Sequence, residues 1–295
     1  MPPVHAPVLV AEAVAFLNPS RGGLFVDCTV GLGGHTRALL EAGASRVLGL
    51  DRDLEAIGLA ADALAAFADR VELLHADYRD LDRVLDARGV HVVAGALADL
   101  GMSSLQLDAE GRGFSFRRDE PLDMRMDRSA GPTAAELLAR VDERDLADLI
   151  HHFGEERFSR RIARAVVETR QSAPLATTGQ LAQVIRRAVP TRGRQRIDPA
   201  TRTFQALRIW VNRELEGLGT FLEAAARRLA AGARLVVISF HSLEDRIVKQ
   251  VFKGLAQGEA ALRVLTKRPV GPGHDEVARN PRARSAKLRA IERLA

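Results

Sequence analysis

Short apolar runs alternate with amphipathic segments over the first hundred residues, and apolar runs return near the C-terminal end. Brief runs bounded by Gly or Asp are typical of buried strands, whereas apolar positions three or four residues apart are typical of helices. The expected strands are Leu24–Cys28, Arg46–Leu50, Val71–His75, Val92–Leu97, Leu235–Phe240, Leu262–Leu265 and Leu288–Ile291. The expected helices between the early strands are Thr36–Glu41, Leu54–Phe67 and Leu81–Ala87. This alternation predicts right-handed βαβ units and a parallel sheet covered on both faces.

The middle of the chain breaks this alternation, because residues of about 105–200 contain no convincing strand. A loop rich in Gly, Arg and Asp, Gly111–Asp127, comes first. The expected helices after it are Ala134–Leu138, Glu143–His152, Phe158–Thr169 and Gln180–Val189. The sequence therefore predicts an α/β fold interrupted after its fourth strand: residues 1–104 and 205–295 form the sheet domain, and residues 105–204 form an inserted helical domain.

Two further helices are predicted from their first residues. Asp198 is a good N-cap and Pro199 suits the first helical position, so a long helix is expected to follow. The apolar face of that helix would hold Phe204, Leu207, Val211, Leu215 and Leu218. Arg202 and Arg213 would lie opposite, on a face that is either solvated or in contact with RNA. A second helix is expected to begin at Ser242, with Asp245 completing a capping box.

Composition narrows the class of protein. The 295 residues include one cysteine, Cys28, which excludes a disulfide scaffold. No apolar run approaches the roughly 20 residues that a membrane helix requires. The N-terminal residues show no basic segment followed by a long apolar one, so no export signal is expected. These features predict a cytoplasmic location and no membrane partner.

The positive charge is unevenly distributed. The net charge is +5, but residues 155–213 contain 13 Arg against four Asp or Glu, a local net of +9. Arginine keeps its charge and offers a planar fork suited to phosphate. The predicted insertion is therefore expected to dock on a polyanion.

Glycines and acids gather at the ends of the early predicted strands. The turn Gly31–Gly34 follows the first strand and precedes a helix, which allows a ligand to approach the backbone closely. Asp51, Asp77 and Asp99 end the second, third and fourth strands, and Tyr78 could stack on a base. Any one acid could be only a helix cap, but together they converge on one crevice. Because basic residues are lacking there, this nucleoside pocket favours S-adenosylmethionine over NADP or ATP.

Longer motifs allow a comparison with a known family. They are Gly33-Gly34-His35, Leu50-Asp51-Arg52-Asp53, Asp99-Leu100-Gly101-Met102-Ser103-Ser104, Arg112-Gly113-Phe114-Ser115-Phe116, Pro121-Leu122-Asp123-Met124-Arg125-Met126-Asp127, Gly154-Glu155-Glu156-Arg157-Phe158, Ala200-Thr201-Arg202-Thr203-Phe204-Gln205-Ala206, Ser239-Phe240-His241-Ser242-Leu243-Glu244-Asp245-Arg246 and Asn280-Pro281-Arg282-Ala283-Arg284-Ser285. Across essentially the whole chain, the sequence resembles the bacterial ribosomal RNA small subunit methyltransferase H family, also called MraW.

The resemblance implies a Rossmann-like class I methyltransferase sheet with an inserted helical domain. It implies S-adenosylmethionine-dependent methylation of N4 of one cytidine in the decoding region of 16S rRNA, within the 30S ribosomal subunit. The cofactor contacts carried over by position are Gly33, Gly34, His35, Asp51, Tyr78, Asp99 and Gln106. Tyr78 replaces a Phe of some relatives and keeps an aromatic ring; Leu105 replaces a frequent Pro before Gln106.

Substrate contacts and chemistry are less directly specified. Arg202, Phe204 and Arg208 are predicted to bind the RNA, although Arg208 flanks the apolar helix face and could be structural. The N4 lone pair of cytosine is delocalised, so an acceptor for an N4 proton would assist attack. Asp99 could be that catalytic acceptor, or it could bind the amino-acid part of the cofactor. No metal site is predicted, because helix capping explains His241–Glu244.

Two other classes of function remain open on the sequence. A non-catalytic ribosome assembly factor could bind the cofactor only as a ligand, although the intact glycines and strand-end acids argue against it. A methyltransferase acting on DNA or on protein would have similar composition. Because an arginine-rich insertion fits any nucleic acid, composition cannot separate these substrates.

Overall fold

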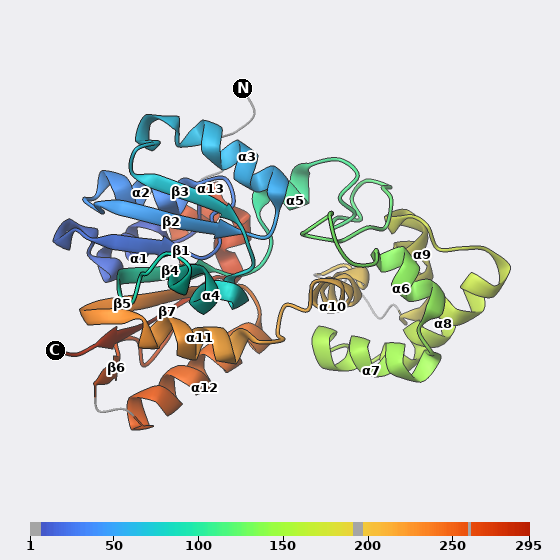
Figure 1. Ribbon diagram of the computed structural model, residues 1–295. Helices are drawn as coiled ribbons and strands as arrows, with labels where there is room; N and C mark the ends of the chain where they lie inside the picture. The colour runs from blue at the N-terminus through green and yellow to red at the C-terminus, as the bar shows by residue number, and fades with distance from the viewer. Residues whose placement is uncertain (1–6, 191–196, 259–260) are drawn as a thin grey trace. The chain divides into compact units, whose positions relative to one another are not determined.

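The computed structural model describes residues 7–190, 197–258 and 261–295 (Figure 1). Contacts along the chain divide it into two compact units: residues 1–103 with 215–295, and residues 104–214. The second boundary differs from the position predicted at 204/205. That position would cut the helix Ala200–Asn212, which packs along Glu143–Gly154 of the second unit and therefore belongs wholly to it.

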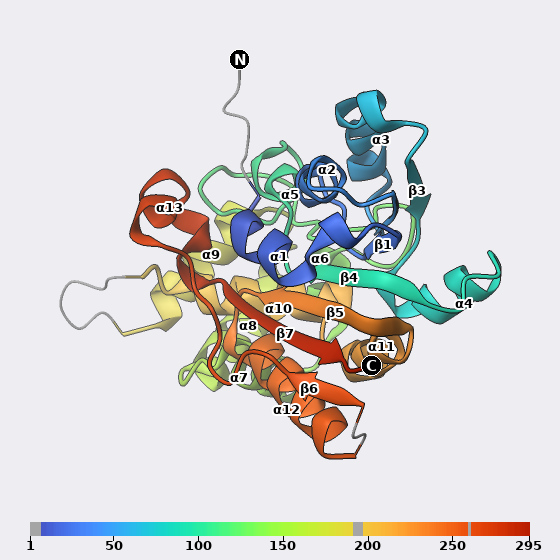
Figure 2. The same ribbon diagram turned by 90° about the vertical axis from the view of Figure 1, so that its left-hand side faces the viewer.

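The first unit is built on one seven-stranded sheet with the order β3-β2-β1-β4-β5-β7-β6 (Figure 2). The strands are β1 (Leu24–Asp27), β2 (Arg46–Asp51), β3 (Val71–His75), β4 (Val93–Asp99), β5 (Leu229–Ser239), β6 (Leu262–Val264) and β7 (Lys287–Arg293). Strands β1 to β5 pair in parallel, whereas β7 runs antiparallel to both β5 and β6. All seven expected strands are confirmed, with ends that differ by a few residues.

Helices cover both faces of this sheet. They are α1 (Val10–Leu17), α2 (Gly34–Glu41), α3 (Leu54–Ala63), α4 (Leu81–Asp86), α11 (Leu218–Arg227), α12 (Ser242–Gly258) and α13 (His274–Arg279), with short 3-10 turns η1 (Pro19–Arg21), η2 (Ala65–Phe67), η3 (Tyr78–Asp80) and η4 (Pro281–Ser285). Apolar residues of α4, α11 and α12 pack on one face of the sheet, and those of α1 and α2 pack on the other. The inner strands β1, β4 and β5 are therefore buried on both sides, as is typical of parallel sheets, whereas the edge strand β3 is only partly buried.

The strand side chains alternate between these two cores. Val26 and Cys28 face the core with α4 and α11, while Phe25, the residue before Val26, faces the core with α1 and α2. Side chains alternate in this way because successive residues of a strand point to opposite faces of the sheet. Asp27 is the last residue of β1, at its carboxyl end.

The second unit contains no strand among its described residues, as predicted. Its helices are α5 (Ser104–Asp108), α6 (Ala134–Arg140), α7 (Glu143–Gly154), α8 (Ser159–Ser172), α9 (Thr178–Ala188) and α10 (Ala200–Asn212). Capping boxes begin two of them, with Thr133 paired to Glu136 at α6 and Thr177 paired to Gln180 at α9. These reciprocal hydrogen bonds satisfy backbone donors that a helix start leaves unpaired.

The expected long helix after Asp198 is shorter than predicted. Asp198 caps it, since its Oδ1 accepts a hydrogen bond from the Ala200 N–H at 2.9 Å. The helix ends at Asn212 because Arg213 adopts a left-handed conformation with φ 51°, and Leu218 instead opens α11. Phe204 and Leu207 are buried and Arg202 is exposed, in agreement with the predicted faces. The helix also buries Arg208 and Asn212, so its buried surface is wider than the predicted apolar face.

Within the described residues, none of the helices combines the length and apolar character needed to span a bilayer.

Candidate active site

A glycine turn joins β1 to α2. Gly33 is the N-cap of α2 and has φ 82°, a left-handed conformation that favours glycine. A β-carbon on Gly34 would lie only 2.6 Å from Cγ of Pro7. The sharp turn predicted before the helix N-terminus is therefore confirmed. Gly33 is required for its backbone conformation, and Gly34 is required because a larger side chain would have no space.

Asp51 ends β2, and its carboxylate binds the backbone of the glycine turn. Its Oδ2 accepts a hydrogen bond from the Gly31 N–H at 2.7 Å, and its Oδ1 accepts one from the Asp53 N–H at 2.8 Å. Burial raises the pKa of this carboxyl to about 6, although both hydrogen bonds favour its charged form. Sequence reasoning missed this structural role. Each oxygen can still accept a second hydrogen bond, so a ribose contact remains compatible with it.

Asp99 ends β4 and lies beside residues of the turn after β1 and of α2. Its N–H donates to Thr29 Oγ1 at 2.6 Å, and its Oδ2 lies 3.7 Å from His35 Nδ1. Its other oxygen, Oδ1, is buried and has no hydrogen-bond partner among the residues that the structure describes. Burial raises the pKa of Asp99 to about 7; His35 opposes this rise, while Asp27 and Glu244 add to it. A buried carboxylate oxygen without a partner is costly and marks a place for a ligand.

His35 lies in the first turn of α2 with only 5% of its surface exposed. Its Nε2 lies 3.0 Å from the Val8 carbonyl oxygen, which can only accept, so Nε2 carries a proton. His35 Nδ1 lies on the other side of the ring, 3.7 Å from Asp99 Oδ2. The imidazole is committed to these two contacts, so a cofactor contact at His35 falls to its backbone N–H, among the first of α2.

Asp27 belongs to the same group of acids, although the sequence analysis gave it no role. It is fully buried, and its carboxylate accepts from Thr36 Oγ1 at 2.7 Å and from the Thr29 N–H at 3.1 Å. Burial raises its pKa to about 6 against these hydrogen bonds. Because Asp27 ends an apolar strand as Asp51 and Asp99 do, the same criterion would have found it.

The end of β3 is arranged differently. Asp77 forms two hydrogen bonds with its neighbour Arg79, at 2.8 and 2.6 Å, and Arg52 lies 3.9 Å away. Burial alone would raise the pKa of Asp77, but these arginines lower it below its usual value. The Asp77 carboxylate is thus bound by arginine side chains. The Tyr78 ring is half-buried and lies 4.7 Å from the Phe221 ring of α11, centroid to centroid.

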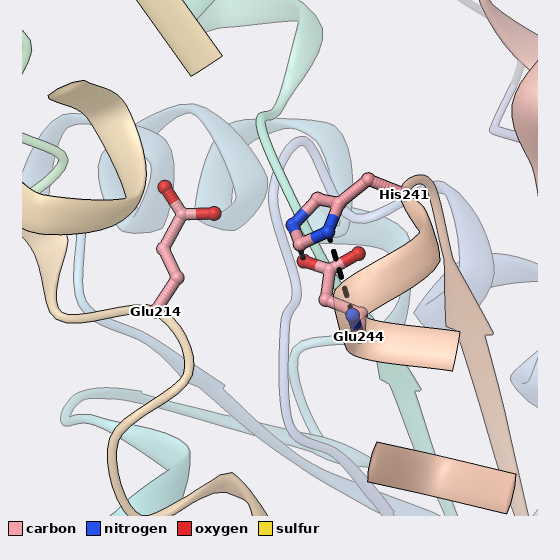
Figure 3. Close-up of side chains that lie close together, drawn as sticks. All are labelled: Glu214, His241 and Glu244. Carbon is pink, nitrogen blue, oxygen red and sulfur yellow. Dashed lines mark hydrogen bonds and ion pairs between the residues drawn. The ribbon is translucent and has the colours of Figure 1, made fainter. Parts of the chain in front are cut away.

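The start of α12 corrects the predicted capping box. His241 Nδ1 accepts from the Glu244 N–H at 3.4 Å, and Glu244 Oε2 accepts from the Phe240 N–H at 2.9 Å. His241 Nε2 also lies 3.1 Å from Glu244 Oε1 (Figure 3). The cap is therefore one residue earlier than the Ser242–Asp245 pair, and Asp245 instead binds Arg289 at 2.6 Å.

In the second unit the predicted residues have distinct environments. Gln106 is buried on α5, and Phe204 is buried on α10 with its ring 4.7 Å from that of Phe116. The Arg202 side chain is 55% exposed and donates to the Glu155 carbonyl oxygen at 3.2 Å. Arg208 differs from expectation: it is buried and donates to both oxygens of Glu214 at 2.8 Å. Because Glu214 neutralises the charge of this buried guanidinium, the prediction that Arg208 binds RNA is withdrawn.

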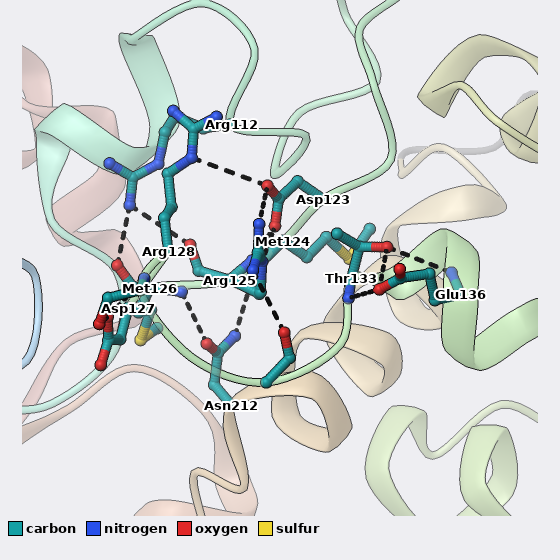
Figure 4. Close-up of polar contacts among 12 residues, drawn as sticks. Arg112, Asp123, Met124, Arg125, Met126, Asp127, Arg128, Thr133, Glu136 and Asn212 are labelled. Atoms are coloured by element: carbon teal, nitrogen blue, oxygen red, sulfur yellow. Dashed lines mark hydrogen bonds and ion pairs between the residues drawn. The ribbon is translucent and has the colours of Figure 1, made fainter.

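The loop between α5 and α6 is tightly bonded (Figure 4). The fully buried Arg112 donates to the carbonyl oxygens of Arg125 and Met126 at 3.3 and 3.0 Å. Asn212 of α10 accepts from the Met126 N–H and donates to the Met124 carbonyl oxygen, each at 2.8 Å. The two methionines are buried, so they fill packing space within this unit.

The strand order, the reversed β7 and the glycine turn beside strand-end acids define a class I methyltransferase. The fold class expected from the sequence is confirmed. The chain belongs to the MraW methylase family, whose sequence model matches residues 3–294. Its methyl donor is S-adenosylmethionine, as the sequence predicted.

Individual relatives agree with this placement. Proteins called ribosomal RNA small subunit methyltransferase H from Bradyrhizobium diazoefficiens and Sorangium cellulosum are each 52% identical to this chain, covering 98% of it and 91% of their own length. Among solved structures, an rRNA methylase from Streptococcus thermophilus is 14% identical and covers 99% of both chains, with a TM-score of 0.45.

Proposed function

We propose that this chain transfers a methyl group from S-adenosylmethionine to N4 of a cytidine in the decoding region of 16S rRNA. The relatives named above support the rRNA substrate, since they match 98% of this chain at 52% identity. The choice of N4 and of the decoding region rests on the family resemblance of the sequence motifs. The 30S subunit is the expected context of the reaction.

The polar groups at the strand ends of the first unit support cofactor binding there. The unpartnered Oδ1 of Asp99 carries this assignment, because an α-ammonium group would satisfy a buried carboxylate oxygen. Asp51 would accept from the ribose hydroxyls, and Tyr78 would stack on the adenine. The N–H groups of Gly34 and His35 would face the ligand at the start of α2. Gln106 is also proposed to contact the cofactor.

The chemistry follows from these positions. When bound, S-adenosylmethionine supplies a methyl group activated by its positive sulfonium. The protein has to align N4 with that methyl group, because the delocalised lone pair makes the amine a poor nucleophile. Between the two roles left open for Asp99, we favour the cofactor ammonium, since Asp99 is fixed at the β4 end beside the glycine turn. The methylated amine can then lose its proton to water.

The inserted unit would dock the RNA. Arg202 is exposed on α10 and is suited to a phosphate contact, whereas the buried Phe204 would act through packing against Phe116. A cytidine within rRNA must leave its stack before N4 can reach the methyl group.

Methyl transfer from labelled cofactor tests the proposal. The enzyme is incubated with 30S subunits, naked 16S rRNA and DNA, and the product nucleosides are identified by mass. We expect N4-methylcytidine in rRNA. Label in DNA or protein would refute the substrate assignment. Tight cofactor binding without any transfer to the assembled subunit would favour the assembly-factor alternative.

A further inference from the structure

We infer that a hollow between α8 and α9 holds phosphates of the substrate RNA backbone, at a docking point separate from Arg202. The hollow has a volume of about 270 Å³ and is lined by Arg160, Arg161, Arg164, Ala165, Glu168 and Ala188. This inference rests on the proposed function, because it takes the polyanion to be rRNA.

Helix periodicity explains why the arginines gather there. Positions 160, 161, 164, 165 and 168 share one face of α8, since neighbours on a helix surface are three or four residues apart. The opposite face of α8, with Ile162, Ala163 and Val166, is buried. Packing of the apolar face therefore turns the three guanidinium groups toward solvent. The small side chains of Ala165 and Ala188 leave the space between the helices open.

The charge in this hollow is available to a ligand. Arg160 and Arg161 are exposed and take part in no ion pair within the described parts of the chain. Arg164 Nε lies 3.5 Å from Glu143 Oε1, but those side chains are 68% and 44% exposed, and such pairs are weak. Glu168 is the acidic residue of the lining.

Other arginines of this unit are committed to acids. Arg125 binds Asp123 at 2.7 Å, and Arg208 binds Glu214 at 2.8 Å. Arg160 and Arg161 differ from them in having no ion pair within the described residues, and Arg164 in having only an exposed one.

Phosphate is the group that this hollow fits. Two or three guanidinium forks side by side match the repeated oxygens of a nucleic-acid backbone. The C-terminal end of α9 brings partial negative charge to Ala188, and the exposed Arg187 beside it offsets that charge. Contacts of this kind position the RNA without reading its sequence.

A charge-matched pair of variants tests the inference. Arg160→Gln/Arg161→Gln/Arg164→Gln removes three charges from the hollow. The control Lys249→Gln/Lys253→Gln/Lys267→Gln removes three exposed charges from the first unit. Filter binding to naked 16S rRNA over a range of salt concentrations, with calorimetry of the cofactor, compares both variants with the wild type.

The arginine variant is expected to bind rRNA about 10- to 100-fold more weakly, and its slope of log affinity against log salt should flatten by up to about two. Its cofactor Kd should stay at the wild-type value, and the lysine variant should resemble the wild type. Equal effects of both variants, or an unchanged slope in the arginine variant, would overturn the inference.

A second variant and the wild-type arm separate the possible failures. Arg160→Lys/Arg161→Lys/Arg164→Lys keeps the charge and should keep the salt slope; a slope as flat as that of the Gln variant would contradict an electrostatic docking role. If wild-type protein methylates rRNA but the hollow variants bind it normally, only this inference fails. If wild-type protein neither binds nor methylates rRNA, the proposed function fails.

Discussion

Protonation of the buried Asp99 carboxyl should make cofactor binding depend on pH. Burial raises the pKa of Asp99 to about 7 from its ordinary 3.8, so much of the free protein carries a proton there at neutral pH. A bound ammonium group requires the charged carboxylate. Binding should therefore displace a proton and should weaken as the pH falls through about 7.

The expected size of the effect follows from that pKa. About ten elevenths of the Asp99 carboxyl would be ionised at pH 8 and about one eleventh at pH 6, so affinity should fall about tenfold between them. Asp99→Asn keeps the shape of the side chain and removes its charge. At pH 8 this variant should lose about 1.5–3 kcal/mol, or roughly 10- to 150-fold in affinity, and its binding should lack the contribution of Asp99 to the pH dependence.

Isothermal titration calorimetry of S-adenosylmethionine at pH 6, 7 and 8 measures both quantities. Running the Asn variant beside the wild type removes ionisation of the ligand itself from the comparison. Titration in two buffers of different ionisation enthalpy counts the released protons. Identical pH dependence in the two proteins would refute the reasoning. An unchanged Kd with a lowered kcat in the variant would assign Asp99 to the N4 proton instead.

Four further substitutions test packing in the two units and the ribose contact of Asp51. Gly154→Ala should cost about 1–3 kcal/mol in urea unfolding, because its β-carbon would lie 2.6 Å from a backbone oxygen of α10. Gly254→Ala meets open space in α12 and should be neutral or stabilising by up to about 1 kcal/mol; equal losses would contradict the crowding argument. Arg208→Ala should cost about 3–5 kcal/mol, since it leaves Glu214 buried without that guanidinium, and wild-type stability would refute a structural role for the pair. Asp51→Asn can accept only one of the two backbone hydrogen bonds, so calorimetry should show about 10- to 100-fold weaker cofactor binding by a folded variant, and unchanged affinity would remove the ribose assignment.

The sequence by itself determined where the strands lie along the chain, the glycine turn and the acids at the strand ends. These features depend on local patterns: apolar runs form strands, glycine adopts left-handed turns, and carboxylates follow the last buried residue. Helix ends were less predictable. Helix α10 stops at Asn212 although its apolar pattern continues to Leu218, because the conformation of Arg213 ends the helix.

Only the tertiary structure decided which side chains are partners. Asp51 accepts a hydrogen bond from the Gly31 N–H, and His35 lies 3.7 Å from Asp99 although 64 positions separate them in the sequence. Arg208 looked like a docking residue until folding buried it against Glu214. Residue type limits which contacts are possible, but strand register and helix packing decide which charges remain in water, and no local pattern contains that information.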